Sequence, residues 1–591
     1  MKYRRKMMLS LALSFAMLGS LAANAETPAP PPMAGDEYGG GAAGTQGGVS
    51  SFSEETSRAG IDILKAGGNA VDAAVAAAFA VGVAEPQHSG IGGCGMMTIY
   101  LKESDEYITL EYLETTPAAQ VPGLFHKGTD SRSAKNAAVP GQVAGLLTAL
   151  EKYGTMTPEQ VLAPAIRLAR EGFALDPIVA GAIADHYETF RGEGKEYELS
   201  LVTDELGLPY TAGDLYVNPD LADTLERIAK NGIAEFYTGE TARRLTECMR
   251  EGGSVMTLED LASYTVMERE PIRTSYYGYD IVTAPPPSMG GDWLLEMLNI
   301  MELEDIASET QGSAEYWRLF NEANRVCMGD TYACAGDPAF FELPVKRMIS
   351  KEFAAERASL IGETGTVEVI PECDLQARRL GQAGGGLPGT GEPGAESANT
   401  THIAVIDRYG NMVSATETIG NTWGCKTAAK GLGFWLNSHI SNMDHTDPES
   451  ADYVMPGKRV RSTISPTIVV KDGTPVMAIG SPGSLVIPPA IACVINNALL
   501  YGMDLQEAVN APRAICMDLN ENDGASLDMT AETGRIDPAV MEGLREIGYL
   551  PKENVGDYDL ILGGIAAILR DEDGTIYAGA DRRRTYKALA Y

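Results

Sequence analysis

The residue with the clearest chemical potential is Thr400, which follows a segment rich in Gly and Pro. Residues 381–394 contain seven Gly and two Pro, so they do not form a regular helix or strand. Residues 402–407 behind Thr400, with the apolar run 403–406 at their centre, predict a strand. A Thr hydroxyl is a weak nucleophile unless a base lies beside it, and an α-amino group, which titrates near about pH 8, is such a base.

An internal Thr gains a free α-amine only when the peptide bond before it is cut. Self-cleavage between Asn399 and Thr400 is therefore one interpretation of this stretch. It requires an irregular segment, a short polar residue, a Thr and a strand, and the sequence has them in that order. An ordinary interdomain linker has the same composition, so this order alone leaves both interpretations open.

The sequence lacks the motifs of several other enzyme chemistries. Its six His form no His-Glu-x-x-His helix, and there is no Walker loop and no Gly-x-Ser-x-Gly elbow. The Gly-rich residues 90–95 follow a predicted helix rather than a strand, which argues against a dinucleotide-binding turn. We therefore expect no metal and no cofactor. His402 lies on a predicted strand, which favours a packed, hydrogen-bonded side chain over a general base.

Three hairpins are predicted in the last third of the chain, each with a turn that contains Gly. Their strands are residues 402–407 with 412–419, 467–470 with 475–479, and 565–569 with 575–578. Helices are predicted at about 487–501 and 537–546, and upstream at 57–83 and through much of 140–265, while residues 95–118 alternate like strands. This pattern indicates an α/β layered fold.

Residues 1–25 are typical of a secretory signal peptide. A basic start (Lys2, Arg4, Arg5, Lys6) precedes an apolar run, and Ala23-Asn24-Ala25 provides small residues for cleavage. Residues 26–50, rich in Pro and Gly, are predicted to be a disordered lead. We expect a periplasmic or secreted protein without a membrane anchor.

The formal net charge is −35, and removal of the four positive groups in residues 1–25 gives −35 − 4 = −39. Such a chain repels nucleic acid, so no nucleic-acid partner is expected. The eight Cys include no Cys-x-x-Cys pair, and most are expected to be buried thiols.

Short motifs spread over residues 50–591 occur in the order found in one enzyme family. They are GGNAVDAA at 67–74, EP at 85–86, SGIGG at 89–93, NTTH at 399–402, SPTI at 465–468 and GSPG at 480–483. By these motifs the chain resembles the γ-glutamyltransferases (glutathione hydrolases), which are N-terminal nucleophile hydrolases. The resemblance implies a four-layer αββα core and a proenzyme that cuts itself into a large subunit, residues 51–399, and a small catalytic subunit, residues 400–591.

The resemblance also assigns roles to single residues. Thr400 would attack an amide carbonyl and form an acyl-enzyme, and the Thr418 hydroxyl would orient the Thr400 amine. The backbone N–H groups of Gly483 and Ser484 would form the oxyanion hole. The remaining substrate-binding positions would be Ser462, Thr463, Gly420, His439 and Asn442.

The positions that would recognise the substrate depart from the family pattern. Leu113 stands where the family has an Arg that clamps the glutamyl α-carboxylate, and a Leu cannot make such a contact. Gly420, His439 and Asn442 stand in place of an Asn, a Gln and an Asp.

Three interpretations therefore remain open. The first is a γ-glutamyl hydrolase or transferase acting on glutathione or γ-glutamyl peptides, with a cation such as Arg459 or Arg461 in place of the missing Arg. The second is a related acylase of the cephalosporin-acylase or small-amide type. The third is a secreted binding protein without turnover.

Overall fold

The computed structural model describes residues 40–367, 375, 378–379, 399–517, 526–552 and 555–591. The predicted signal peptide and the Gly- and Pro-rich segment 381–394 lie outside these residues. Among the described residues, no helix combines the length and the apolar character that crossing a bilayer requires.

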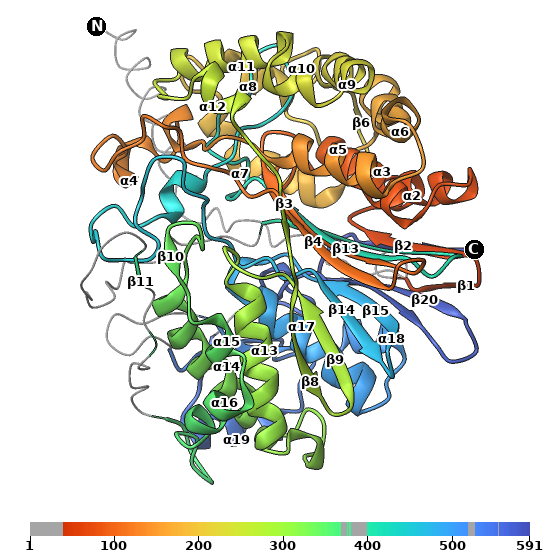
Figure 1. The fold of residues 1–591 in the computed structure, drawn as a ribbon, viewed down its shortest axis with the longest axis vertical. Helices are drawn as coiled ribbons and strands as arrows, with labels where there is room; N and C mark the ends of the chain where they lie inside the picture. Colours follow the sequence, from red (N-terminus) through yellow and green to blue (C-terminus); the bar gives the residue numbers. More distant parts are fainter. Residues whose placement is uncertain (1–39, 368–374, 376–377, 380–398, 518–525, 553–554) are drawn as a thin grey trace, which may run out of the picture. The chain divides into compact units, whose positions relative to one another are not determined.

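Two seven-stranded antiparallel sheets form the centre of the fold (Figure 1). The first runs in the order β21 (Lys587–Ala590), β2 (Gly47–Ser51), β12 (Thr401–Asp407), β13 (Met412–Thr418), β3 (Cys94–Leu101), β4 (Glu106–Glu111) and β7 (Met267–Arg269). The second runs in the order β1 (Ala42–Gly44), β20 (Ile576–Ala580), β19 (Ala566–Arg570), β15 (Thr474–Gly480), β14 (Thr467–Lys471), β9 (Tyr279–Thr283) and β8 (Ile272–Tyr276). The sheets face each other, with β12 and β13 packed against β15.

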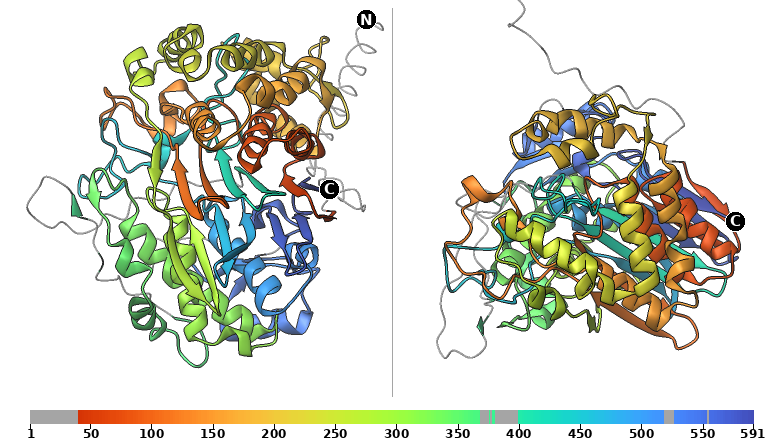
Figure 2. Two further views of the ribbon diagram at one scale, coloured as in Figure 1. Left: turned by 45° about the vertical axis from the view of Figure 1, so that its right-hand side comes forward. Right: turned by 90° about the horizontal axis from the view of Figure 1, so that it is seen from above.

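Helices cover the outer face of each sheet. The first sheet is covered by α2 (Glu54–Lys65), α3 (Ala70–Ala84) and α5 (Gln142–Tyr153), with α6 (Pro158–Glu171) packed on α3. The second is covered by α13 (Gly290–Leu303), α17 (Ile487–Ile495) and α18 (Leu505–Asn510). In Figure 2 the helices between residues 177 and 262 lie on the same side as α2 and α3. The αββα prediction is confirmed.

Helix α3 shows why this layer packs tightly. Every one of its residues is buried, and nine of them are Ala or Gly, so the helix lies close to the sheet on one side and to α2 and α6 on the other. The Asn69 side chain accepts hydrogen bonds from the N–H groups of Val71 and Asp72, and the Asp72 carboxylate accepts one from the Asn69 N–H. This reciprocal capping begins the helix at Ala70.

The predicted hairpins are present as β12–β13, β14–β15 and β19–β20. The prediction of a disordered lead up to residue 50 is wrong over its last part, because β1 and β2 lie there. Strand β1 pairs with β20, and β2 pairs with both β12 and β21. Their Gly-rich sequences have a weak strand propensity, and pairing with strands hundreds of residues away overrides it.

Seven of the eight cysteines lie in the described part of the chain. Six of these seven are buried, as predicted. Cys248 is the partly exposed one.

His402 is fully buried on β12, between the two sheets. Its Nδ1 lies 2.9 Å from the Thr416 Oγ1 and its Nε2 lies 3.3 Å from the Ser414 Oγ. Burial lowers the pKa of His402 to about 3. The prediction of a packed, hydrogen-bonded His is confirmed.

We expect His402 to make the fold sensitive to acid. An unfolded His titrates near pH 6.5 and the folded one at about 3, so the folded state binds fewer protons between these values. The free energy of unfolding should fall as the pH decreases through this window, by up to about 1.4 kcal/mol per pH unit. Denaturant titrations at pH 7 and 4.5 should show a loss about 2 kcal/mol smaller in His402→Asn than in wild type. The exposed-site variant His126→Asn is the control, and equal losses in all three proteins would contradict the prediction.

Candidate active site

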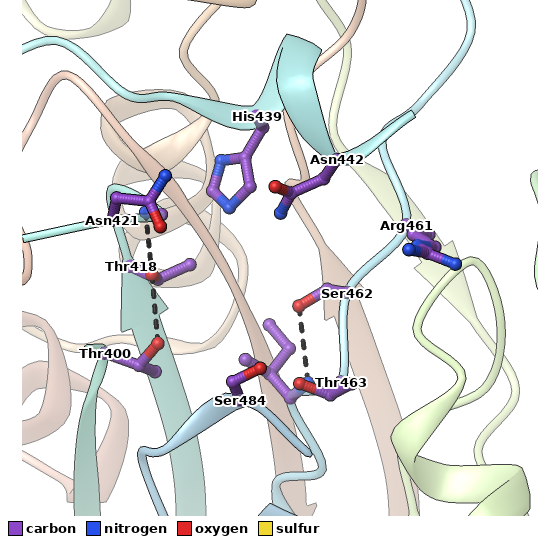
Figure 3. A pocket seen from close by; sticks show the side chains of 11 residues that line it. Thr400, Thr418, Asn421, His439, Asn442, Arg461, Ser462, Thr463 and Ser484 are labelled. Carbon is purple, nitrogen blue, oxygen red and sulfur yellow. Dashed lines mark hydrogen bonds between the residues drawn. The ribbon is translucent and has the colours of Figure 1, made fainter. Parts of the chain in front are cut away.

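The β12–β13 hairpin places Thr400 and Thr418 side by side. The register pairs Thr401 with Glu417, so Thr400, just before β12, stands opposite Thr418 at the end of β13. The Thr400 hydroxyl donates to the Thr418 Oγ1 at 3.0 Å, and the same oxygen accepts from the Gly420 N–H at 3.0 Å (Figure 3). The backbone thus orients Thr418, and Thr418 in turn orients the Thr400 hydroxyl.

The peptide bond between Asn399 and Thr400 is held on both sides. Thr422 donates to the Asn399 side-chain oxygen at 2.6 Å, and Arg584 donates to the Thr400 carbonyl at 3.2 Å. Thr400 has a φ of 92°, a conformation that costs a β-branched residue about 1–3 kcal/mol. Surrounding contacts therefore hold a strained backbone at the bond that the sequence predicts to be cut.

The N–H of Gly483 points at this same bond. It donates to the Asn399 carbonyl oxygen at 3.1 Å, within the range of an oxyanion-hole donor. Gly483 and Ser484 follow β15 and have φ values of 124° and 58°, so the chain turns sharply there. A tetrahedral intermediate formed by attack on Asn399 would place its negative oxygen at this donor.

A pocket with an empty volume of about 370 Å³ opens beside Thr400 (Figure 3). Its lining residues are Thr400, Thr418, Gly420, Asn421, His439, Asn442, Arg461, Ser462, Thr463, Ile464 and Ser484. All five predicted substrate-binding residues are among them. Gly483 and Asn399 do not line the pocket, but the hydrogen bond described above joins them. Asn421 and Ile464 were not predicted, although each adjoins or nearly adjoins a predicted residue.

Leu113 is fully buried and belongs to an apolar cluster rather than to the pocket lining. Of the two cations considered as replacements, Arg459 pairs with Glu111 at 2.7 Å and lies outside the pocket lining. Arg461 lines the pocket on the side away from Thr400 (Figure 3). Its Nε lies 3.1 Å from an Asp452 oxygen. Of these two arginines, only Arg461 therefore lines this pocket.

Gly420 and His439 depend on each other sterically. Gly420 has a φ of 86°, and a Cβ there would lie 2.5 Å from the Ser438 Oγ and 3.3 Å from the His439 Nε2. The imidazole therefore occupies space that a side chain at position 420 would need. The second ring nitrogen, Nδ1, lies 2.9 Å from a Glu114 oxygen.

A buried charge cluster, which the sequence did not reveal, lies next to Thr400. Glu85 accepts a hydrogen bond from Thr401, lies 3.7 Å from Arg584 and lies 2.8 Å from the His88 Nδ1. Burial raises the pKa of Glu85 to about 8, and burial lowers the pKa of His88. The Arg584 contact to the Thr400 carbonyl links this cluster to the candidate nucleophile.

The chain is similar in sequence to known enzymes over most of its length. The sequence model described as Gamma-glutamyltranspeptidase matches residues 56–591. A glutathione hydrolase proenzyme of Bacillus subtilis (strain 168) is 34% identical, over 95% of this chain and 94% of that protein. The acylase ACY 1 proenzyme of Pseudomonas sp. (strain SE83) is 35% identical, over 91% of this chain and 92% of that protein.

Among solved structures, the crystal structure of cephalosporin acylase from Bacillus halodurans is similar, with a TM-score of 0.82 and 25% identity. The match covers 96% of this chain and 99% of that one. The names of these relatives thus include both a glutathione hydrolase and acylases.

Proposed function

This chain belongs to the γ-glutamyltranspeptidase family and is a hydrolase, and from that premise we propose that it is a secreted, self-processing amidase with Thr400 as its nucleophile. The observation that supports this most directly is the contact pair at one peptide bond. The Thr400 hydroxyl is held by Thr418, while the Gly483 N–H holds the Asn399 carbonyl oxygen. The alternative of a binding protein without turnover is set aside, because the chain belongs to an enzyme family.

Self-cleavage begins with attack of the Thr400 Oγ1 on the Asn399 carbonyl carbon. The peptide C–N bond breaks, the nitrogen takes the hydroxyl proton, and an ester links Asn399 to the Thr400 side chain. This step frees the Thr400 α-amine, and water then hydrolyses the ester, which gives a carboxylate at Asn399, restores the Thr400 hydroxyl and separates the two chains. The strain at the Thr400 backbone, together with the Gly483 donor, favours the first step.

Turnover then uses the freed amine as the base. The Thr400 α-amine takes the proton of its own hydroxyl, and the oxygen attacks the substrate amide. The N–H groups of Gly483 and Ser484 stabilise the tetrahedral oxyanion, and the departing amine takes the proton. Water or a second amine then attacks the acyl-enzyme, which yields hydrolysis or transfer.

For the acyl group we propose a γ-glutamyl unit, as in glutathione or γ-glutamyl peptides. Arg461, Ser462 and Thr463 form a continuous stretch of the pocket wall, and together they offer a guanidinium and two hydroxyls to an α-carboxylate. Asn442 and His439 lie nearby for the α-amine (Figure 3). An acylase with another acyl group is the second candidate, favoured by the apolar Leu113 at the position of the family's clamp.

The experiment that separates these candidates is turnover of a γ-glutamyl anilide beside a panel of anilides with other acyl groups. We expect the γ-glutamyl substrate to have the highest kcat/KM. If only another acyl anilide is cleaved, the γ-glutamyl proposal fails and the acylase candidate takes its place.

Arg461 is expected to set the affinity for the γ-glutamyl carboxylate. Loss of a charge-assisted contact costs about 1.5–3 kcal/mol, so Arg461→Met should raise KM for the γ-glutamyl anilide by roughly 10- to 150-fold, with little change in kcat. Arg461→Lys should keep part of the affinity. The matched control is the same measurement with an anilide that lacks the α-carboxylate, for which KM should stay constant. An equal rise in KM with both substrates would show that Arg461 only shapes the pocket.

A further inference from the structure

A thiol, a carboxylate and an imidazole meet at one wall of the pocket. Cys94 begins β3, Glu114 lies in the segment after β4, and His439 begins the short helix η3 (His439–Asn442). One ligand atom from each, the Cys94 Sγ, a Glu114 oxygen and a His439 ring nitrogen, all lie within 4.8 Å of one another. All three residues are at least 96% buried, and His439 also lines the pocket.

The surroundings of this cluster are rich in negative charge. The Glu114 Oε2 is buried and has no hydrogen-bond partner, and the same holds for the Oε2 of Glu417. Within the described chain, the ion pair to Glu114 comes from His439. A buried carboxylate oxygen without a donor is costly, so the site favours a bound cation.

We propose that Cys94, Glu114 and His439 bind a divalent transition metal of the zinc type. Thiolate sulfur, imidazole nitrogen and carboxylate oxygen are the ligands that Zn²⁺ takes in proteins, and three protein ligands leave one position for water or a ligand. The metal replaces the thiol proton, which is released to solvent. The three ligands match no metal-binding spacing motif, because Cys94 and Glu114 are 20 residues apart and His439 lies more than 300 residues further on, so the sequence predicted no metal.

The metal site adjoins the proposed amidase site without taking part in its chemistry. Bound metal would hold the His439 ring in place, and that ring forms part of the pocket wall beside Gly420. The bound metal would therefore help to position the substrate. Metal binding does not require Thr400, so the Thr400→Ala variant should bind metal as wild type does, even if every proposal about turnover fails.

The test is a metal titration of the full-length protein after treatment with a chelator under reducing conditions. We expect one equivalent of Co²⁺ to bind, with the visible absorption of a four-coordinate site and a thiolate-to-cobalt charge-transfer band, and Zn²⁺ should displace it. Cys94→Ala should lose the charge-transfer band. His439→Gln should weaken binding by more than about 10-fold, since the loss of even an outer partner typically costs 10- to 100-fold.

Cys248→Ala is the matched control, because Cys248 is a free, partly exposed thiol outside the cluster. This variant should keep both the stoichiometry and the band. Circular dichroism of each variant checks that it is folded. Binding of less than about a tenth of an equivalent by folded wild-type protein would overturn the proposal, in favour of a thiol that shares a proton with Glu114. A band that survives in Cys94→Ala would overturn it equally.

Discussion

Replacing Thr400 with alanine is expected to leave one uncut chain without amidase activity. The variant lacks the hydroxyl that attacks Asn399, and without cleavage no α-amine forms to act as a base. Loss of the nucleophile should lower kcat by at least about 10³-fold. Wild-type protein should yield a small fragment of 591 − 399 = 192 residues beginning at Thr400, and a large one of 399 − 25 = 374 residues if the signal peptide is removed.

Gel electrophoresis, mass spectrometry and N-terminal sequencing measure these products. Thr400→Ser is the matched control. It keeps the hydroxyl and lacks only the methyl group, so it should still be cut. An intact wild-type chain that is folded, or cleavage of Thr400→Ala at the same bond, would refute self-processing by Thr400.

The second large effect is expected at Gly483. Its φ of 124° is unfavourable for any residue with a Cβ, and the added carbon would lie 2.4 Å from the Val486 Cγ1. Because both the φ strain and the Val486 contact oppose a Cβ here, we expect Gly483→Ala to shift the backbone that aims its N–H at the Asn399 oxygen. Removal of one oxyanion donor costs about 10²- to 10³-fold in rate, and we expect self-cleavage to slow by a factor of this order.

A time course of fragment formation in the purified precursor measures this rate. Gly473→Ala provides the control, because Gly473 also has a positive φ, 75°, but no atom lies within 4 Å of the added carbon. That variant should lose some stability from strain and still be cut at the wild-type rate. Equal cleavage rates in the two variants would mean that Gly483 is not the donor.

The two expectations differ in how far they depended on tertiary structure. Thr400 was predicted from a Gly-rich segment, a Thr and a strand that are contiguous, and its hairpin was predicted from a local turn at Gly410. Such features depend on neighbouring residues, so they can be predicted without knowledge of the fold. The contact between Gly483 and Asn399 joins residues 84 positions apart, and only the packing of β12 against β15 brings them together.

Strands β1 and β2 show where the local sequence gave a wrong prediction. Their Gly-rich sequence predicted disorder, yet they pair with strands near the end of the chain and with β12. Local composition describes what a segment prefers by itself. The hydrogen bonds of a sheet depend on partners that the local sequence does not contain.

By itself, the sequence determined the layered αββα fold, the hairpins, the candidate nucleophile and the positions that now line one pocket, because each rests on a local pattern or a motif. Only the tertiary structure decided that Arg461 rather than Arg459 lines the pocket, that Gly420 makes room for His439, and that Cys94, Glu114 and His439 meet. The physical reason is that a contact depends on where two side chains point after distant strands have paired. Spacing along the chain does not carry that information.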